Sequence, residues 1–162
     1  MSGRLARDIK QSKPFSSPIL EVYFNLLRTT DELSRATVHL LKPYDLTEAQ
    51  YNVLRILRGA GDDGLPCSEI GDRLLTHDPD VTRLVDRLER RELVARMRDQ
   101  RDRRVVTVRL SLAGLELLAT CDLDRHLVAT LQPRFANFSS ENHQNLIHLL
   151  ELLRETTTDH GA

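Results

Sequence analysis

The sequence contains few of the residues from which disulfide frameworks, metal sites and redox sensors are built. Its 162 residues include two cysteines, six histidines and no tryptophan. Cys67 and Cys121 are too few for a disulfide framework and form no CxxC motif, and the histidines form no HxxxH motif or tight Cys/His cluster. We therefore expect no bound metal and no cofactor, and we interpret both cysteines as reduced core residues.

Long apolar runs and catalytic motifs are missing as well. No stretch approaches the roughly 20 apolar residues of a membrane-spanning helix, and the start of the chain shows no signal-peptide pattern. A nucleophile elbow, a phosphate-binding loop and a metal-binding pair are also missing. With a length that suits one compact domain, these absences predict a soluble cytoplasmic protein that has no contact with membranes and is not an enzyme.

The distribution of charge along the chain indicates the kind of partner better than the net charge does. The net charge is −1 for the whole chain. Residues 83–104 contain nine arginines, no lysine and five acidic residues, so this stretch has a net charge of +4. The planar guanidinium group suits phosphates and base edges better than the lysine ammonium group does. The stretch therefore indicates a nucleic-acid partner, although the same charges at helical spacing also fit a salt-bridged solvent face.

Residues 79–111 contain this basic stretch, and their hydrophobic period changes once. An apolar stripe with helical spacing is formed by Val81, Leu84, Val85 and Leu88. The opposite side of that helix carries Arg83, Asp86, Arg87 and Arg90. From residue 93 the period becomes two, and it resumes over residues 105–110 after the charged residues 99–104. We predict a helix followed by a two-stranded hairpin with a charged tip.

The chain before this stretch predicts an arm, a long helix, a second helix and a helix-turn-helix. Residues 1–17 mix basic residues with Ser and Pro, as in a loose basic arm. Apolar residues recur at spacings of three and four over residues 18–41, and Pro43 ends that helix. Thr47 and Gln50 form a capping box for the next helix, which ends near residue 59. Pro66 begins a short helix to about residue 75, which forms a helix-turn-helix with the basic helix that follows.

The chain after residue 110 predicts two more helices with large apolar surfaces. Ser111 caps a helix that continues to about residue 131, where Pro133 stops it. Phe138 and Ser139 are the staple and cap of the last helix. Its apolar stripe consists of Leu146, Leu149, Leu150 and Leu153. Because long apolar helices flank the helix-turn-helix on both sides, we expect a second copy to cover them in a twofold homodimer.

The order of these elements and two motifs within it resemble the MarR family of winged helix-turn-helix transcriptional regulators. The motifs are VTRLVDRLERRELV at residues 81–94 and DQRDRRVVTVRLSLAG at residues 99–114. The resemblance covers residues 18–155 and implies a mostly α fold of the α+β class. It implies a single domain at 18–158, with a winged-helix lobe at 47–110 that carries a two-stranded β-hairpin wing. The expected dimerisation helices are 18–42 and 111–158, after a flexible basic arm at 1–17.

The resemblance implies a sequence-specific regulator, most simply a repressor, that binds a pseudo-palindromic operator in double-stranded DNA as a homodimer. The recognition helix enters the major groove, and the arginine tip of the wing enters an adjacent minor groove. In this sequence the implied DNA-binding residues are Ser68, Thr82, Arg83, Arg87, Arg101, Asp102, Arg103 and Arg104. Asp102 is expected to hold the turn by pairing with Arg104, and Ser68 either contacts phosphate or caps its helix.

Two features depart from the family pattern. Glu92 stands where the family usually has glycine, which predicts a less relaxed turn between the recognition helix and the wing. Asp78 and Asp80 put negative charge at the start of the recognition helix. Acidic residues there suit the helix dipole, but they repel phosphates unless they point away or accept from a cytosine amino group.

The family also implies release from DNA by a small, often aromatic, anionic effector bound between the dimerisation helices and the DNA-binding lobe. The candidate effector-binding residues in this sequence are Tyr23, Phe24, His39, Tyr44 and Tyr51, each of which also fits a core position. Two alternatives stay open: a winged-helix interaction or dimerisation module that does not bind DNA, and a metal- or redox-responsive regulator. The three arginines within residues 99–104 favour DNA binding, because a module that binds only protein does not need them.

Overall fold

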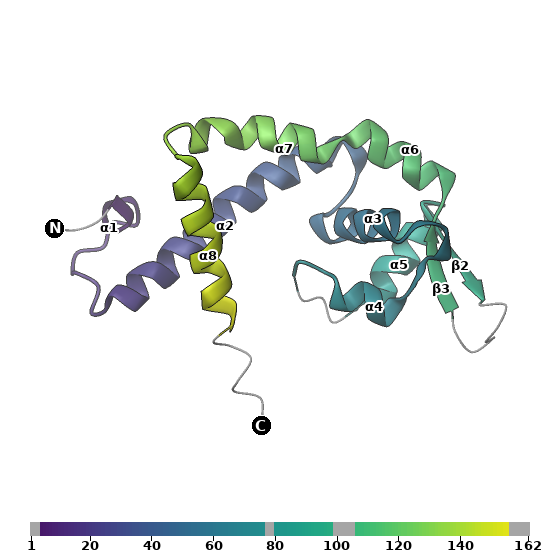
Figure 1. The fold of residues 1–162 in the computed structure, drawn as a ribbon, viewed down its shortest axis with the longest axis horizontal. Coiled ribbons are helices and arrows are strands. Elements are labelled where there is room, and N and C mark those ends of the chain that lie inside the picture. Colours follow the sequence, from purple (N-terminus) through teal and green to yellow (C-terminus); the bar gives the residue numbers. More distant parts are fainter. Residues whose placement is uncertain (1–3, 77–79, 99–105, 156–162) are drawn as a thin grey trace, which may run out of the picture. The chain divides into compact units, whose positions relative to one another are not determined.

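The computed structural model describes residues 4–76, 80–98 and 106–155, which form helices and one small antiparallel sheet (Figure 1). In chain order the elements are α1 Arg4–Asp8, α2 Pro18–Leu41, the 3-10 helix η1 Lys42–Tyr44, α3 Glu48–Ala60, the 3-10 helix η2 Gly61–Asp63, β1 Leu65–Pro66, α4 Cys67–Asp72, α5 Val81–Arg90, β2 Val94–Arg98, β3 Val106–Leu110, α6 Leu112–Cys121, α7 Leu123–Leu131, the 3-10 helix η3 Gln132–Phe135 and α8 Ser140–Glu155. The chain divides into two compact units, Met1–Leu127 and Val128–Ala162.

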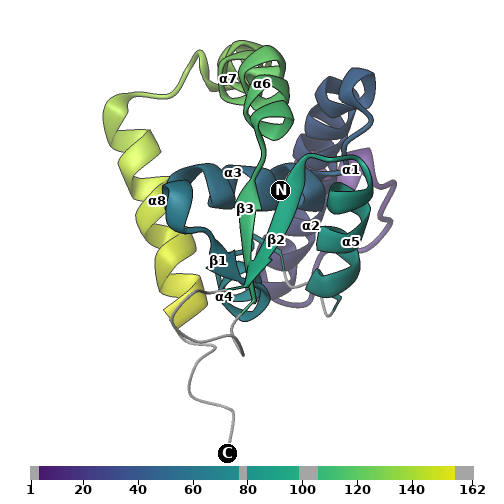
Figure 2. The ribbon, with the colours of Figure 1, turned by 90° about the vertical axis from the view of Figure 1, so that its right-hand side faces the viewer.

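The first unit contains the predicted winged-helix lobe. Strand β3 lies between β1 and β2 and is antiparallel to both, as Figure 2 shows. The pairing of Val94 with Leu110 and of Arg98 with Val106 confirms the predicted hairpin. The third strand was not predicted. It has only two residues, of which Leu65 pairs with Val108.

The core of this lobe is formed where α3, α4 and α5 pack against the sheet. Leu57 of α3, Ile70 of α4 and Val85 of α5 are completely buried, as is Val108 of β3. The predicted apolar stripe of α5 is confirmed, since Leu84, Val85 and Leu88 are its buried residues. Burying each such side chain contributes about 1.5–3 kcal/mol. The basic side of α5 is therefore the side turned away from this core.

Helix starts were the most predictable feature of the local structure. Thr47 Oγ1 accepts from the Gln50 N–H at 3.2 Å, and Gln50 Oε1 accepts from the Thr47 N–H at 3.0 Å, so the predicted capping box is confirmed. Ser111 Oγ likewise accepts from the Gly114 N–H at 3.0 Å and caps α6. Gly114 is required there because an added Cβ would lie 2.2 Å from the Leu93 carbonyl oxygen. The start of α6 is thereby held against the residue that precedes β2.

Three expectations about element boundaries differ from the structure. Pro66 lies in β1 and is the N-cap of α4, not its first residue, and α4 ends at Asp72. The helix expected to continue to residue 131 is interrupted at Asp122, which adopts a left-handed conformation with φ of 35°. At this break, His126 Nδ1 is hydrogen-bonded to the Cys121 carbonyl oxygen at 3.0 Å. Residues 1–17 were expected to be loose, but α1 lies within them and buries Leu5.

The second unit contains the last helix and its cap. Ser139 Oγ accepts from the Asn142 N–H at 3.1 Å, which confirms the predicted cap of α8. The Phe138 ring lies 5.5 Å from the His143 ring, so the predicted staple residue contacts the first turns of the helix. None of the described residues of α8 is buried within the chain. Among all the described helices, none is both long and apolar enough to cross a membrane.

Candidate nucleic-acid interface

The exposed side of α5 carries the residues expected to contact DNA. Thr82, Arg83 and Arg87 are all exposed, whereas Leu84 and Val85 between them are buried. Asp80 is the N-cap of the helix, and its Oδ1 accepts from the Arg83 N–H at 3.1 Å. Its other carboxylate oxygen lies 2.9 Å from Arg83 Nε. The acidic start of α5 is thus partly neutralised by the arginine that follows it.

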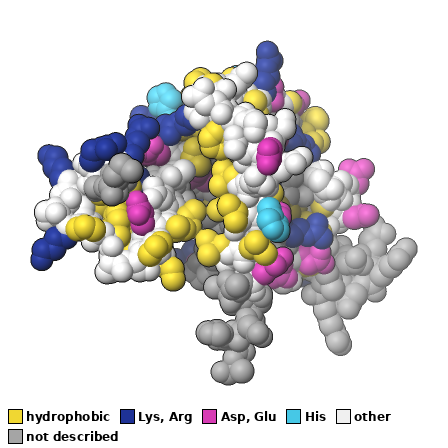
Figure 3. All heavy atoms as spheres, turned by 60° about the vertical axis from the view of Figure 1, so that its left-hand side comes forward, with side chains coloured by type: hydrophobic (Ala, Val, Ile, Leu, Met, Phe, Trp, Pro, Cys, Tyr) yellow, Lys and Arg dark blue, Asp and Glu magenta, His cyan; other side chains and the backbone are white. Residues whose placement is uncertain are grey.

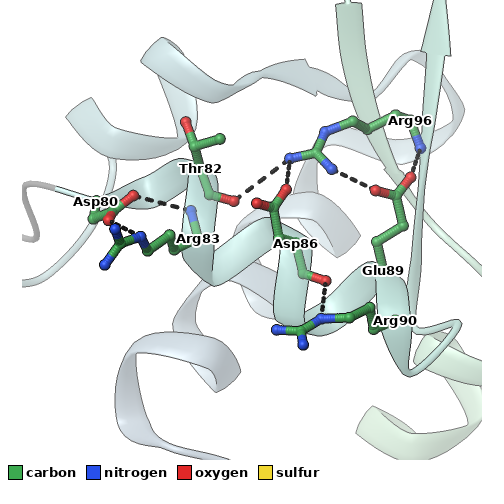
Figure 4. A network of polar contacts seen from close by, with 7 residues as sticks. All are labelled: Asp80, Thr82, Arg83, Asp86, Glu89, Arg90 and Arg96. Carbon is green, nitrogen blue, oxygen red and sulfur yellow. Dashed lines mark hydrogen bonds and ion pairs between the residues drawn. The ribbon is translucent and has the colours of Figure 1, made fainter.

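A network of charged side chains fixes α5 to strand β2 (Figure 4). Arg96 of β2 donates to the Asp86 carboxylate at 2.5 Å and also to the Glu89 carboxylate. A second bond to Glu89 comes from the Arg96 backbone N–H at 3.2 Å. Partial burial of Arg96 favours a lower pKa, but these hydrogen bonds outweigh it and raise its pKa. Asp86 was expected on the outer face of α5, yet it belongs to this contact with the sheet.

The sequence contains a signal for the contact between Arg96 and the helix, but the period of two alone does not reveal it. Arg96 lies two residues after the buried Val94, so it points to the same side of β2. That side faces the lobe, and a long arginine there needs acidic partners from the neighbouring helix. Asp86 and Glu89 are thus paired with Arg96 of the sheet and not with arginines at helical spacing on a solvent face, and Arg87 has no ion-pair partner among the described residues.

The turn between α5 and β2 is strained at Glu92. Its φ is 57°, the left-handed region that residues with a Cβ rarely adopt. The Glu92 carbonyl accepts a 2.6 Å hydrogen bond from Ser111 Oγ, and the Ser111 N–H donates to the Leu93 carbonyl at 3.1 Å. The expected unfavourable turn is confirmed, and the first residues after β3 hold it in place. On the other side of α5, Asn52 supports the segment that connects α4 to α5, since its Oδ1 accepts from the Leu75 N–H at 2.9 Å.

Of the other residues expected at the DNA interface, the structure describes only Ser68. Ser68 is exposed near the start of α4, and it is not the cap of that helix, because Pro66 is the N-cap. The wing tip, with Arg101, Asp102, Arg103 and Arg104, lies outside the described residues, as does Asp78.

The five candidate effector residues do not meet at one cavity. Tyr23 and Phe24 pack edge to face at 5.4 Å on α2, and His39 is exposed further along that helix. The Tyr44 hydroxyl donates to the Thr120 carbonyl at 3.2 Å, and Tyr51 is a core residue whose phenol pKa is raised by burial. The structure therefore separates these residues into an exposed aromatic pair, an exposed imidazole and two packed tyrosines.

Two cavities of the first unit are lined by residues other than the five effector candidates. One, of about 320 Å³, is lined by α2, by α3 and by the segment that follows α4. In it Ser34 Oγ donates to the Glu48 carboxylate at 2.5 Å. Its lining residues are Thr30, Leu33, Ser34, Thr37, Glu48, Asn52, Leu75 and Thr76. The other, of about 560 Å³, is an open groove lined by Val38, Lys42, Asp45, Leu46, Thr47, Gln50, Arg87, Arg90 and Arg91. None of the five candidate effector residues lines either cavity.

The cysteines and histidines do not form a sensor site among the described residues. Cys121 is 1% exposed, and its burial raises the pKa of its thiol, which keeps the thiol protonated at neutral pH. Cys67 is partly exposed at the start of α4. Within residues 4–76, 80–98 and 106–155, no group of three or more His, Cys, Asp or Glu side chains is arranged to hold a metal ion.

Comparison with known proteins agrees with this architecture. The model of the MarR family matches residues 46–106. A MarR transcription factor from Planctomyces limnophilus, known from its crystal structure, is 38% identical, with a TM-score of 0.62 over 85% of this chain and 98% of that chain. A mutant MarR from E. coli, solved in complex with operator DNA, is 25% identical, with a TM-score of 0.68 over 83% of this chain and 94% of that chain.

A curated relative gives the same result over a shorter part of its own length. The HTH-type transcriptional regulator TtmR of Methylorubrum extorquens is 34% identical over 108 residues, which are 67% of this chain and 54% of that protein. The chain spans about half the length of the curated relatives it matches. The recognition helix, the wing strands and the cap of α6 lie where the two sequence motifs predicted them, in a chain similar over nearly the whole of a solved family member. The chain belongs to the MarR family.

Proposed function

We propose that the protein is a sequence-specific transcriptional regulator that binds double-stranded operator DNA as a homodimer. The observation that carries this proposal is the exposed row of Thr82, Arg83 and Arg87 on a helix whose opposite side is buried in a winged-helix core. Such a helix can enter the major groove with its polar side chains toward base edges and phosphates. The E. coli relative of 25% identity was solved on operator DNA, which supports the same partner here.

The wing supplies the second part of the proposed interface. Arg101, Arg103 and Arg104 insert into an adjacent minor groove, whose negative potential attracts arginine. Asp102 holds the turn by pairing with Arg104, and Ser68 contacts a phosphate from the start of α4. The exposed position of Ser68 and its lack of a capping role support this last assignment.

A homodimer accounts for the apolar surface that one chain leaves uncovered. Hydrophobic side chains gather on the face of the molecule drawn in Figure 3. On α2, Ile19 is 78% exposed and Leu27 is 51% exposed, and on α8, Leu149 is 62% exposed. Monomeric proteins seldom leave a large apolar patch in water. Two copies that share these surfaces present two recognition helices to successive turns of a pseudo-palindromic operator.

The regulator acts in the cytoplasm, most simply as a repressor that a small molecule releases. The aromatic pair Tyr23 and Phe24 and the residues His39, Tyr44 and Tyr51 stay candidates for effector contact, although they line neither cavity of the described residues. The cavity of about 320 Å³ contains the Glu48 carboxylate and no basic side chain, so its charge favours a neutral or cationic molecule.

Replacing Arg87 with Ala tests the proposed interface. We expect about tenfold weaker binding to the intergenic DNA upstream of the protein's own coding sequence, since one lost base or phosphate contact costs about 1–3 kcal/mol. If Arg87 contacts a phosphate, the slope of log K against log salt concentration falls by about 1. Fluorescence anisotropy titrations at several salt concentrations measure both quantities.

Arg28→Ala is the matched control, because Arg28 lies on α2 and pairs with Glu32 at 3.0 Å. Its affinity for DNA should equal that of the unmodified chain. The double variant Arg103→Ala with Arg104→Ala tests the wing in the same titration and should also weaken binding and flatten its salt dependence. Binding that is absent or insensitive to salt in the unmodified protein would instead favour a winged helix that binds only protein.

A further inference from the structure

Arg91 joins the end of the recognition helix to the turn that follows α2. It is the C-cap of α5, and its own N–H donates to the Leu88 carbonyl at 3.2 Å. Its guanidinium group donates to two carbonyl oxygens of the η1 turn, that of Tyr44 at 3.0 Å and that of Asp45. It also lies 3.8 Å from the Asp45 carboxylate. The contact therefore connects two segments that are more than 40 residues apart in sequence.

Tyr44 connects the same turn to α6. Its hydroxyl donates to the Thr120 carbonyl at 3.2 Å, in the last turn of that helix, and its ring packs against the core of the lobe. The η1 turn itself continues directly from α2. Because α2 and α6 are among the helices expected in the dimer, these bonds lead from the proposed dimer helices to the proposed DNA-reading helix.

The η1 turn has a fixed shape. Asp45, which ends it, is left-handed with φ of 52°, and its N–H donates to the Lys42 carbonyl at 3.1 Å. Leu41 before the turn and Leu46 after it are both buried in the core. Since both ends of the turn are anchored, the carbonyl oxygens that accept from Arg91 point in fixed directions.

Capping explains only part of this arrangement. The last carbonyls of a helical turn need donors, which water or a lysine could also supply. Arg91 supplies them with a planar fork that spans two carbonyls, from a side chain that is 33% exposed. Two bonds from one planar group restrict the direction of the helix end as well as its distance from the turn.

We propose that Arg91 and Tyr44 are positioning residues that fix the angle of the recognition helix relative to the dimer helices, and thereby set the half-site spacing that the dimer accepts. The inference rests on the proposed function, because spacing matters only to a dimer on a two-part operator. One base pair inserted between half-sites moves them apart by about 3.4 Å and rotates them by about 35°. Rigidly held helices cannot follow this change without losing contacts, whereas loosely held helices can.

The first test measures the distance between the two recognition helices in the full-length dimer without DNA. A nitroxide label on Thr82→Cys marks the exposed start of α5, the end away from Arg91. The labelled chain also carries Cys67→Ser, since Cys67 is partly exposed, whereas Cys121 is buried and needs no replacement. Pulsed electron paramagnetic resonance then gives the distribution of distances between the two labels.

Three variants and one control are compared. Arg91→Gln removes the fork, and Arg91→Lys keeps the charge but cannot bridge both carbonyls in one plane, so it decides the question even if Arg91→Gln unfolds. Tyr44→Phe removes only the bond to α6. We expect the distance distribution to broaden or shift in both Arg91 variants and, to a smaller extent, in Tyr44→Phe. Arg35→Gln should leave it unchanged, because Arg35 bonds to Asp31 within α2.

The second test measures the preference for spacing by fluorescence anisotropy. The probes are duplexes of the upstream intergenic DNA with its natural dyad, and the same duplexes with one base pair inserted or removed at the dyad centre. The unmodified protein should bind the natural spacing about tenfold more tightly, since a wrong spacing breaks contacts at one half-site. Arg91→Gln should lower this ratio about fivefold. A residue that only stabilises the lobe would weaken binding to all the duplexes alike and leave the ratio unchanged.

The outcomes separate this proposal from the proposed function. Distance distributions that are identical in the Arg91 variants and the parent, an unchanged spacing ratio, or equal changes in Arg35→Gln would each overturn the positioning role and leave operator binding intact. A labelled protein that gives no distance between labels is monomeric, which would overturn the proposed dimer and the positioning role together. A dimer whose distribution broadens but which binds none of the duplexes would support the fixed angle and overturn operator binding, and the spacing role with it.

Discussion

At the scale of single residues, Arg96 links the recognition helix to the first strand of the wing. It is the basic residue that joins β2 to two carboxylates of α5, and its side chain is only 26% exposed. Both carboxylates pair with Arg96 of the sheet, which would keep them from facing the phosphates in the proposed DNA complex. In the proposed complex, Arg96 would therefore contribute to DNA binding through the position of the helix, and Arg87 through direct contact.

Replacing Arg96 with Met keeps most of the aliphatic volume and removes the charge. We expect the free energy of unfolding to fall by about 1–2 kcal/mol, since two charge-assisted hydrogen bonds are lost while the partly exposed carboxylates regain some water. Urea denaturation followed by circular dichroism measures the change.

Arg35→Met provides the matched comparison, because Arg35 forms an exposed pair with Asp31 at 2.6 Å on α2. That substitution should cost less than about 0.5 kcal/mol. In a double-mutant cycle, Arg96→Met and Glu89→Gln should show a coupling of about 1 kcal/mol. Additive effects of the two substitutions would mean that the contact does not stabilise the fold.

At the scale of elements, the turn from α5 to β2 determines where the wing begins. Glu92 occupies this turn with φ of 57°, and a residue with a Cβ loses about 1–2 kcal/mol in that conformation. Glu92→Gly should therefore raise the free energy of unfolding by about 0.5–1 kcal/mol, after the larger entropy loss of glycine is subtracted. Thermal unfolding of the two proteins under the same conditions measures the gain.

Glu92→Ala separates the backbone from the carboxylate. Alanine keeps the Cβ and so keeps the strain, and we expect no gain from it. A gain as large as that of glycine would show that repulsion of the Glu92 carboxylate, not the left-handed backbone, destabilises the turn.

The same scale shows what periodicity can and cannot predict. The bounds of α2 and the caps at Thr47 and Ser111 follow from spacing and side-chain chemistry, because each involves neighbours in sequence. The break at Asp122 leaves the apolar pattern intact on both sides, so only the backbone reveals it. β1 is two residues long and forms only by pairing with β3 some 40 residues later, a contact without local signal. The groove beside Lys42 likewise joins residues from four separate elements.

At the scale of the whole molecule, the exposed apolar residues of α2 and α8 connect the proposed dimer with the proposed recognition of a two-part operator. A stable interface typically buries about 1,600 Å² and contains a few apolar anchors that contribute most of the binding energy. Leu27 and Leu149 are suitable anchors, because each is large, apolar and at least half exposed in the single chain. A monomer would contact one half-site only, so loss of the dimer should also weaken binding to a full operator.

Glu in place of Leu27 or Leu149 puts an unpaired charge into the expected interface. Each substitution should raise the dimer dissociation constant by at least about thirtyfold, the equivalent of about 2 kcal/mol for an anchor residue, as measured by sedimentation equilibrium. Leu75→Glu is the control, since Leu75 is 78% exposed but lies in the winged-helix lobe, where a charge should leave the dimer intact. A monomeric parent protein at micromolar concentrations, or an equal effect of Leu75→Glu, would contradict the dimer. If the dimer is lost with the circular dichroism spectrum unchanged, the weaker operator binding that accompanies it comes from the lost pairing of two recognition helices and not from unfolding.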